Sequence, residues 1–167
     1  SASWYRNAVS LIADRTSPSE LFSSGKLLGR PSAGRMSMFF YDPKTKARMP
    51  YYDTFPLVLP LEPMKGGFIG LNFHYLPYGA RFAFLQQLQT LASNSKFDQS
   101  TKIQATYQQV KSNKYVKASI KRYLYSQVRS QFLRVNVDEM ALAAYLPVAQ
   151  FQGASLGSVF AKSRRTY

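Results

Sequence analysis

Short apolar runs, broken by proline, glycine or charge, are the feature that most limits how this chain can fold. No run approaches the ~20 apolar residues that a membrane-spanning helix requires, so we expect no membrane contact. Over residues 36–41 neighbouring side chains alternate as in a strand, and residues 42–45 form a strong turn signal. The pattern therefore predicts short antiparallel strands.

Two further segments of the central region are expected strands. Residues 55–61 are rich in β-forming side chains but are interrupted by Pro56 and Pro60, which favours an edge strand or the ends of a strand. A Lys-Gly-Gly sequence at 65–67 predicts a loop, after which residues 68–73 return as a strand. We therefore expect a small antiparallel β meander of three or four strands over residues 36–73.

Helical patterns dominate the second half of the chain. Residues 80–92 carry an apolar stripe, and residues 101–110 and 139–146 are further expected helices. The strongest pattern covers residues 115–132, where apolar side chains recur every four positions: Val116, Ile120, Leu124 and Val128. The expected fold class is α+β, with the meander packed against a mostly helical C-terminal half.

The two ends differ in composition from the centre. Residues 1–35 are expected to form an N-terminal arm of short helices, ending in a Gly-rich, basic linker over residues 25–35. Residues 36–150 would form a single α+β domain, and residues 151–167 a basic C-terminal tail. Because such arms order against neighbouring subunits, we expect the protein to be part of a multi-subunit assembly.

Signals for an enzyme are weak. The chain has no cysteine, which excludes a thiolate zinc site and a thiol nucleophile. Its single histidine, His74, is interpreted as a packed ring at a strand end. We predict no catalytic residue, no metal ligand and no cofactor.

A metal-dependent nuclease is the enzymatic alternative. Such enzymes place an Asp on one strand and Glu-x-Lys on the next, whereas here Asp53 is followed by Glu62 and, three positions later, Lys65. Positions three apart on a strand point to opposite faces. We therefore expect Asp53 to cap its own turn or pair with an arginine, and the protein not to be an enzyme.

Positive charge is the strongest indication of a partner. The chain has 22 Lys and Arg against 8 Asp and Glu, a net charge of +14. On the helix expected over 115–132, basic residues at three- and four-residue spacing share one face, where they repel each other without an anionic partner. The alternative is an ordinary solvated face. The predicted basic interaction face consists of Lys111, Lys114, Lys117, Lys121, Arg122, Arg129 and Arg134.

Aromatic residues gather near the expected sheet. The chain has 12 tyrosines, a residue type favoured where one end of the ring is packed and the other is wet. An aromatic core and a docking surface both fit this pattern. The predicted aromatic docking residues are Tyr41, Tyr51, Tyr52, Phe55, Tyr75 and Tyr78.

Particular central motifs resemble those of a known protein family. They begin with Phe40-Tyr41-Asp42-Pro43-Lys44-Thr45-Lys46 and Pro50-Tyr51-Tyr52-Asp53-Thr54-Phe55-Pro56-Leu57. The similarity continues over residues 67–77 and returns more weakly at 129–135 and 138–139. These blocks resemble small virion proteins of contractile-tailed bacteriophages, a family that includes DNA end protectors. No catalytic residue set accompanies the motifs.

Two hypotheses follow from the resemblance and the charge. The first is a non-enzymatic structural component of the virion, in the tail, baseplate or neck, assembled in the host cytoplasm. It would dock to acidic surfaces of other virion proteins. The alternative is a protein that binds double-stranded DNA and caps or protects the packaged ends.

Overall fold

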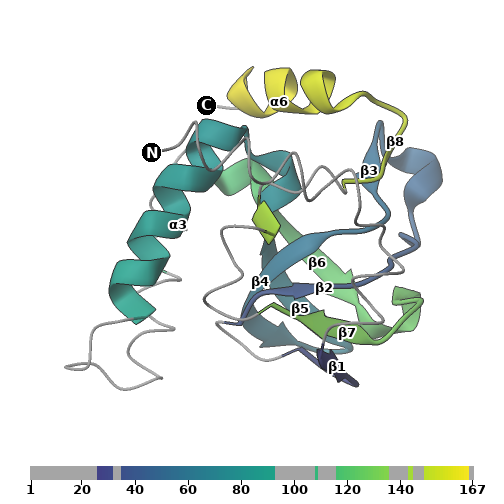
Figure 1. Ribbon diagram of the computed structural model, residues 1–167. Coiled ribbons are helices and arrows are strands. Elements are labelled where there is room, and N and C mark those ends of the chain that lie inside the picture. The colour runs from purple at the N-terminus through teal and green to yellow at the C-terminus, as the bar shows by residue number, and fades with distance from the viewer. Residues whose placement is uncertain are drawn as a thin grey trace.

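The computed structural model describes residues 26–31, 35–92, 108, 116–135, 143–144 and 149–165. These residues form a six-stranded sheet in the order β1-β7-β2-β4-β5-β6, a two-stranded sheet of β3 and β8, and two α-helices (Figure 1). Every strand pair is antiparallel. An antiparallel sheet with helices agrees with the α+β class.

The elements are short. The strands are β1 (Lys26–Leu28), β2 (Ser37–Met38), β3 (Tyr52–Asp53), β4 (Leu57–Met64), β5 (Gly67–Asn72), β6 (Ile120–Leu124), β7 (Phe132–Arg134) and β8 (Phe151–Gln152). The α-helices are α3 (Tyr78–Ala92) and α6 (Leu156–Arg165). The 3-10 helices are η1 (Lys46–Arg48), η2 (Phe73–Tyr75), η3 (Lys117–Ser119) and η4 (Tyr125–Gln127).

The β4–β5 hairpin is the longest pairing in the larger sheet. Its turn contains Gly66 at a φ of 75°, a left-handed conformation that glycine adopts without strain. Both strands and this turn were predicted from the sequence and are confirmed. Of the two prolines in the predicted run, Pro56 directly precedes β4, and Pro60 lies beyond the two residues of β4 that pair with β2. At Pro60, β5 is therefore the neighbour of β4 in the described sheet. The expectation of an edge or a strand end is met at both prolines.

The larger sheet has an apolar core on each face. Leu57 belongs to one buried cluster and the next residue, Val58, to the other; Leu133 and Phe132 are divided in the same way. Since successive strand residues point to opposite faces, the two clusters lie on opposite sides of the sheet. Phe84 of α3 packs into the first cluster. Burial on both sides explains why the two central strands β4 and β5 are apolar at most positions.

The helix predicted over residues 115–132 is wrong. Its residues form η3, β6 and η4, and β6 pairs with β5 through Tyr123 opposite Phe68. Four-residue spacing did not distinguish the two structures, because positions four apart also share one face of a strand. The helix predicted over residues 80–92 is confirmed as α3.

The chain ends contribute more structure than expected. Residues 26–28, predicted to lie in a linker, form β1 and pair with β7. Residues 151–165 of the expected tail contain β8 and α6. The helices expected before residue 25 lie outside the described residues. Of the helices expected over 101–110 and 139–146, only residues 108, 143 and 144 are described, and these are helical. None of the described helices is long and apolar enough to cross a membrane.

Candidate nucleic-acid interface

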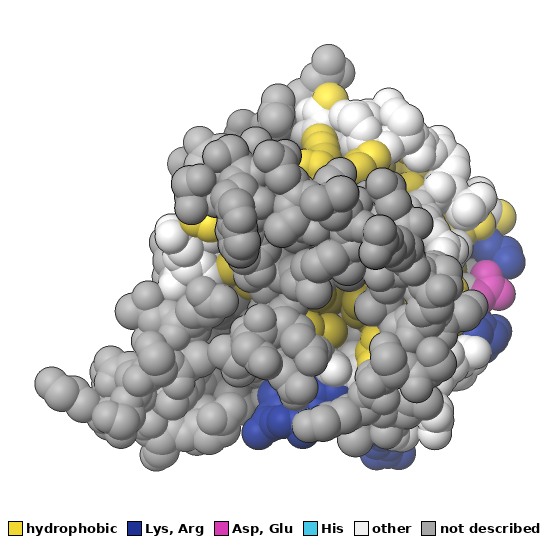
Figure 2. All heavy atoms as spheres, viewed as in Figure 1, with side chains coloured by type: hydrophobic (Ala, Val, Ile, Leu, Met, Phe, Trp, Pro, Cys, Tyr) yellow, Lys and Arg dark blue, Asp and Glu magenta, His cyan; other side chains and the backbone are white. Residues whose placement is uncertain are grey.

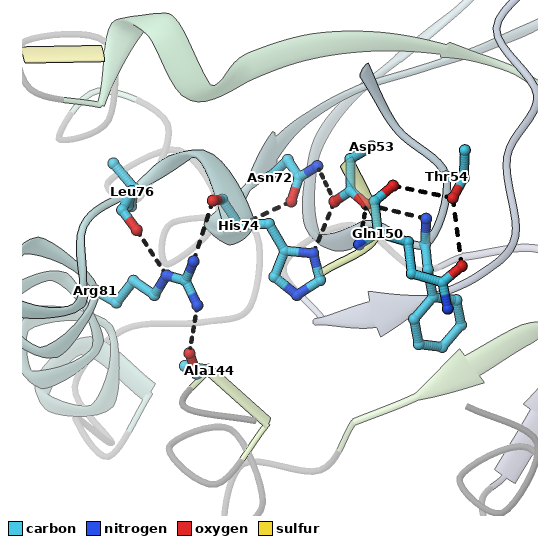
Figure 3. Close-up of polar contacts among 9 residues, drawn as sticks. Asp53, Thr54, Asn72, His74, Leu76, Arg81, Ala144 and Gln150 are labelled. Carbon is cyan, nitrogen blue, oxygen red and sulfur yellow. Dashed lines mark hydrogen bonds and ion pairs between the residues drawn. The ribbon is translucent and has the colours of Figure 1, made fainter. Parts of the chain in front are cut away.

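A buried carboxylate connects the two sheets (Figure 3). Asp53 Oδ1 accepts hydrogen bonds from the backbone N–H groups of Phe55 (3.0 Å) and Gln150 (3.2 Å). Its Oδ2 accepts one from Asn72 Nδ2 (3.0 Å) and lies 2.7 Å from His74 Nδ1. The predicted turn cap is therefore present, and the side chain that pairs with Asp53 is that of His74 rather than of an arginine.

The same carboxylate is unavailable for metal chemistry. Burial by itself would raise the pKa of Asp53. His74 and the hydrogen bonds to the carboxylate together lower the pKa by a larger amount, so it lies below its ordinary value of 3.8. Glu62, the other carboxylate of the nuclease alternative, is exposed. In the part of the chain that the structure describes, no group of three His, Asp or Glu side chains could hold a metal ion.

One arginine is also committed to the fold. Arg81 of α3 is 1% exposed and donates hydrogen bonds to the carbonyl oxygens of Leu76 (2.7 Å), Ala144 (2.8 Å) and His74 (3.1 Å), as Figure 3 shows. Two of these carbonyls lie in η2 and directly after it, and the third lies at residue 144, so the guanidinium ties two segments that are distant in sequence to α3. Arg81 is therefore a structural cation that no external anion reaches.

The predicted aromatic docking residues divide into two groups. Three are buried: Tyr41, Phe55 and Tyr75. The other three are half-buried: Tyr51, Tyr52 and Tyr78. The rings of the buried group pack inside the protein and expose little or no surface to a partner. The hydroxyl of Tyr41, for example, accepts a hydrogen bond from the Leu124 N–H at 3.0 Å.

The predicted basic face does not lie on a helix where the structure describes it. Lys121 is half-buried in β6, its Nζ 4.2 Å from the centroid of the Tyr75 ring, and burial lowers its pKa. Lys117 and Arg122 are exposed, and Arg134 in β7 is half-buried. The remaining predicted residues apart from Arg129 lie outside the described residues: Lys111 and Lys114.

A different surface brings several cations together. Two backbone hydrogen bonds, of 3.0 and 2.9 Å, join residues 40–42 to residues 127–129. A third, from the Tyr125 N–H to the Gly66 carbonyl at 3.0 Å, places the β4–β5 turn beside η4. Segments far apart in the sequence thus meet at one edge of the fold.

Six exposed cations lie on these segments, on the turn and η1 that directly follow residues 40–42, or against η4. We call them the basic edge: Arg30, Lys44, Lys46, Arg48, Lys65 and Arg129. The Arg30 guanidinium lies 5.2 Å from the centroid of the Tyr125 ring. Asp42 accepts a hydrogen bond from Lys46 (2.8 Å) and lies 3.9 Å from Arg129. Figure 2 shows Lys and Arg side chains on both sides of an acidic one along the right-hand edge of this view.

The basic edge is strongly positive at neutral pH. Its six cations and Asp42 give a formal charge of +5. The hydrogen bond with Asp42 raises the pKa of Lys46, while the same bond lowers that of Asp42, so both remain charged. Such a surface attracts polyanions.

Sequence reasoning found one member of the basic edge, Arg129. The missed signal is that every second residue from 44 to 48 is basic. The central region also contains three acidic residues, whose negative charge seemed to balance the positive charge of these residues. One of those acidic residues, Asp53, is buried against His74 and does not offset surface charge. The exposed surface is therefore more basic than the composition of the segment indicates.

Comparison with known proteins decides the family. A family model described as the phage T4 terminal DNA protecting protein matches residues 21–165. The chain belongs to this family. No curated protein and no solved structure matched the chain. The resemblance to the DNA end protectors of contractile-tailed phages is confirmed, whereas the family match gives no support for the tail, baseplate or neck.

The match to the terminal DNA protecting family extends over the whole described structure. Every element from β1 to α6 lies within residues 21–165, as do all six residues of the basic edge. The cationic surface and the buried Asp53–His74 pair therefore both belong to the family domain. Neither is part of an appended segment.

Proposed function

We propose that this chain binds the ends of linear double-stranded phage DNA through the basic edge and keeps nucleases from reaching them. The family match supports a DNA-protecting role. The observation that carries the proposal is the gathering of six exposed cations from separate segments, with Asp42 as the acidic residue among them. An exonuclease must engage the terminal nucleotides, so a protein bound across them blocks it by occupancy.

The expected binding is electrostatic. Each Lys or Arg that contacts a phosphate releases counterions, so six contacts predict a slope of log K against log salt of about −5. Phosphate contacts carry no sequence information. We therefore expect the protein to bind duplexes of different sequence with similar affinity.

Equilibrium binding to a short duplex at ~50 to 200 mM salt tests the proposal. Lys46→Glu combined with Arg129→Glu should greatly weaken binding and flatten the salt slope. Lys117→Glu is the matched control, because Lys117 is exposed but lies in η3, at the opposite end of β6 from η4. No binding by the unaltered protein at ~50 mM salt would contradict the proposal.

We also propose that protection involves no catalysis. Both oxygens of Asp53 are engaged inside the protein, and Glu62 is exposed on β4. Incubation of linear DNA with the protein and Mg²⁺ should leave the DNA intact. Cleavage that disappears in Glu62→Gln would instead support the nuclease alternative.

A place in the virion is the remaining part of the proposal. The net charge of +14 and the basic edge also suit acidic surfaces of other virion proteins. We expect the chain to co-purify with intact particles. Its presence in isolated tails, baseplates or necks would support our first hypothesis of a structural component there, and its absence from purified particles would exclude a virion role.

A further inference from the structure

Tyr52 lies at the border of the basic edge. The Tyr41 N–H donates to the carbonyl oxygen of Thr54 at 3.0 Å, and the next residue, Asp42, holds Lys46. Tyr52 lies in β3, two residues before Thr54 in the chain. The pKa of Lys46 is raised mainly by Asp42 and to a smaller extent by Tyr52, so Tyr52 lies near enough to affect this ammonium group. A half-buried aromatic ring therefore lies next to exposed cations.

Its neighbour Tyr51 has a different environment. The Tyr51 ring lies 6.0 Å from that of Tyr75 and 6.3 Å from that of Phe151, and Lys162 Nζ lies 4.9 Å above it. Tyr52 points to the other side of β3, and its ring packs on no other aromatic ring among the residues that the structure describes. Of these two half-buried tyrosines, Tyr52 is therefore the one whose ring is not covered by a described aromatic ring or lysine, which favours it for contact with an external partner.

A DNA end offers a surface that continuous duplex lacks. Every internal base pair is stacked on both faces, whereas the terminal pair has one face open to solvent. An aromatic side chain can stack on that open face without separating any base step, and stacking tolerates all base types. Nearby cations can hold the phosphates of the last base pairs at the same time.

We infer that the Tyr52 ring stacks on the open face of the terminal base pair, while Lys46 and its neighbours on the basic edge hold the phosphates. This inference rests on the proposed function and adds to it a way to distinguish an end from continuous duplex. Loss of one base–aromatic stack weakens binding by about 5- to 100-fold. We therefore expect a preference for open ends of about that size.

Competition between two duplexes of equal length and sequence tests the inference. One has open blunt ends, and in the other both ends are closed by hairpin loops. The unaltered protein should prefer the open duplex, and Tyr52→Leu should bind both duplexes as the unaltered protein binds the closed one. Tyr52→Phe should keep the preference, because the ring remains.

Phe82→Leu is the matched control, and thermal denaturation verifies that each variant is folded. Phe82 is 36% exposed on α3, which lies on the opposite side of the view from the β3–β8 pair in Figure 1. Phe82→Leu should keep the preference for open ends.

Three results would overturn the inference. The unaltered protein could show no preference for the open duplex, Tyr52→Leu could keep the full preference, or Tyr52→Leu could lose binding to both duplexes equally. Failure of the unaltered protein to bind either duplex would instead contradict the proposed function.

Discussion

Asp53 and His74 make a buried contact that helps to join the two sheets. Asp53 belongs to β3 of the smaller sheet, and His74 follows β5 of the larger one, with 2.7 Å between Oδ2 and Nδ1. Both side chains are shielded from solvent. The pair therefore fixes the position of β3, and with it Tyr52, relative to the rest of the domain.

Removal of this carboxylate should strongly destabilise the fold. Asp53→Ala leaves the amide of Asn72 and two backbone N–H groups without an acceptor, which predicts a loss of about 3–5 kcal/mol in the free energy of unfolding. Urea denaturation measures it. Asp42→Ala, at an exposed carboxylate, should change stability little, and equal effects of the two substitutions would contradict this account.

Stability should also depend on the ionisation of Asp53. Its pKa is lower in the folded protein than its ordinary value of 3.8, so the stabilisation is present above that value and is lost as the pH falls through the folded pKa. We expect the free energy of unfolding to decline below about pH 4. Asp53→Asn should lack this part of the decline. If the free energy of unfolding fell with pH in the same way in Asp53→Asn and in the unaltered protein, the Asp53 carboxylate would not be the source of the decline.

The close approach of β5 and β6 predicts a strict requirement for glycine. A Cβ at Gly67 would collide with the backbone carbonyl of Tyr123 on β6. Gly67→Ala should therefore disrupt strand pairing and lower the melting temperature. Gly79→Ala, where a Cβ meets open space in α3, should leave stability unchanged or raise it by up to about 1 kcal/mol. A well-folded Gly67→Ala would contradict the close approach.

Lys117 and Lys121 should respond differently to charge reversal, although the sequence pattern predicted that both face a partner. Lys121 lies over the Tyr75 ring and is half-buried, so Lys121→Glu should destabilise the protein by about 2 kcal/mol. Lys121→Met, which removes the charge but keeps an apolar chain, should stay within about 1 kcal/mol. Chemical denaturation of both variants measures the free energy of unfolding. If Lys121→Glu were as stable as the unaltered protein, the side chain at position 121 would lie in solvent.

Strand prediction succeeded where turn chemistry and β-forming residues agreed. The hairpin of β4 and β5 could be predicted because two adjacent glycines, Gly66 in the turn and Gly67 at the start of β5, separate two β-forming runs. The segment around β6 could not, because Ile120 and Leu124 satisfy a helical and a strand spacing equally. Its pairing with β5 decides the structure, and that partner is distant in sequence.

The site was less predictable than the fold. Spacing along an expected helix selected Lys117 and Lys121, while the basic edge joins Arg30, the turn at Lys65 and residues 44–48 through tertiary contacts. Aromatic composition likewise does not separate a core from a surface. Among adjacent tyrosines, packing alone shows that Tyr52 differs from Tyr51.

Protection of a DNA end by the basic edge is the central claim, and a digestion experiment tests it most directly. Linear duplex DNA is treated with a processive exonuclease in the presence of the unaltered protein, of Lys46→Glu with Arg129→Glu, or of Lys117→Glu, and the surviving full-length DNA is measured over time. We predict survival with the unaltered protein and with Lys117→Glu, and degradation at the rate of bare DNA with the double variant. Degradation in the presence of the unaltered protein, or full protection by the double variant, would contradict the claim.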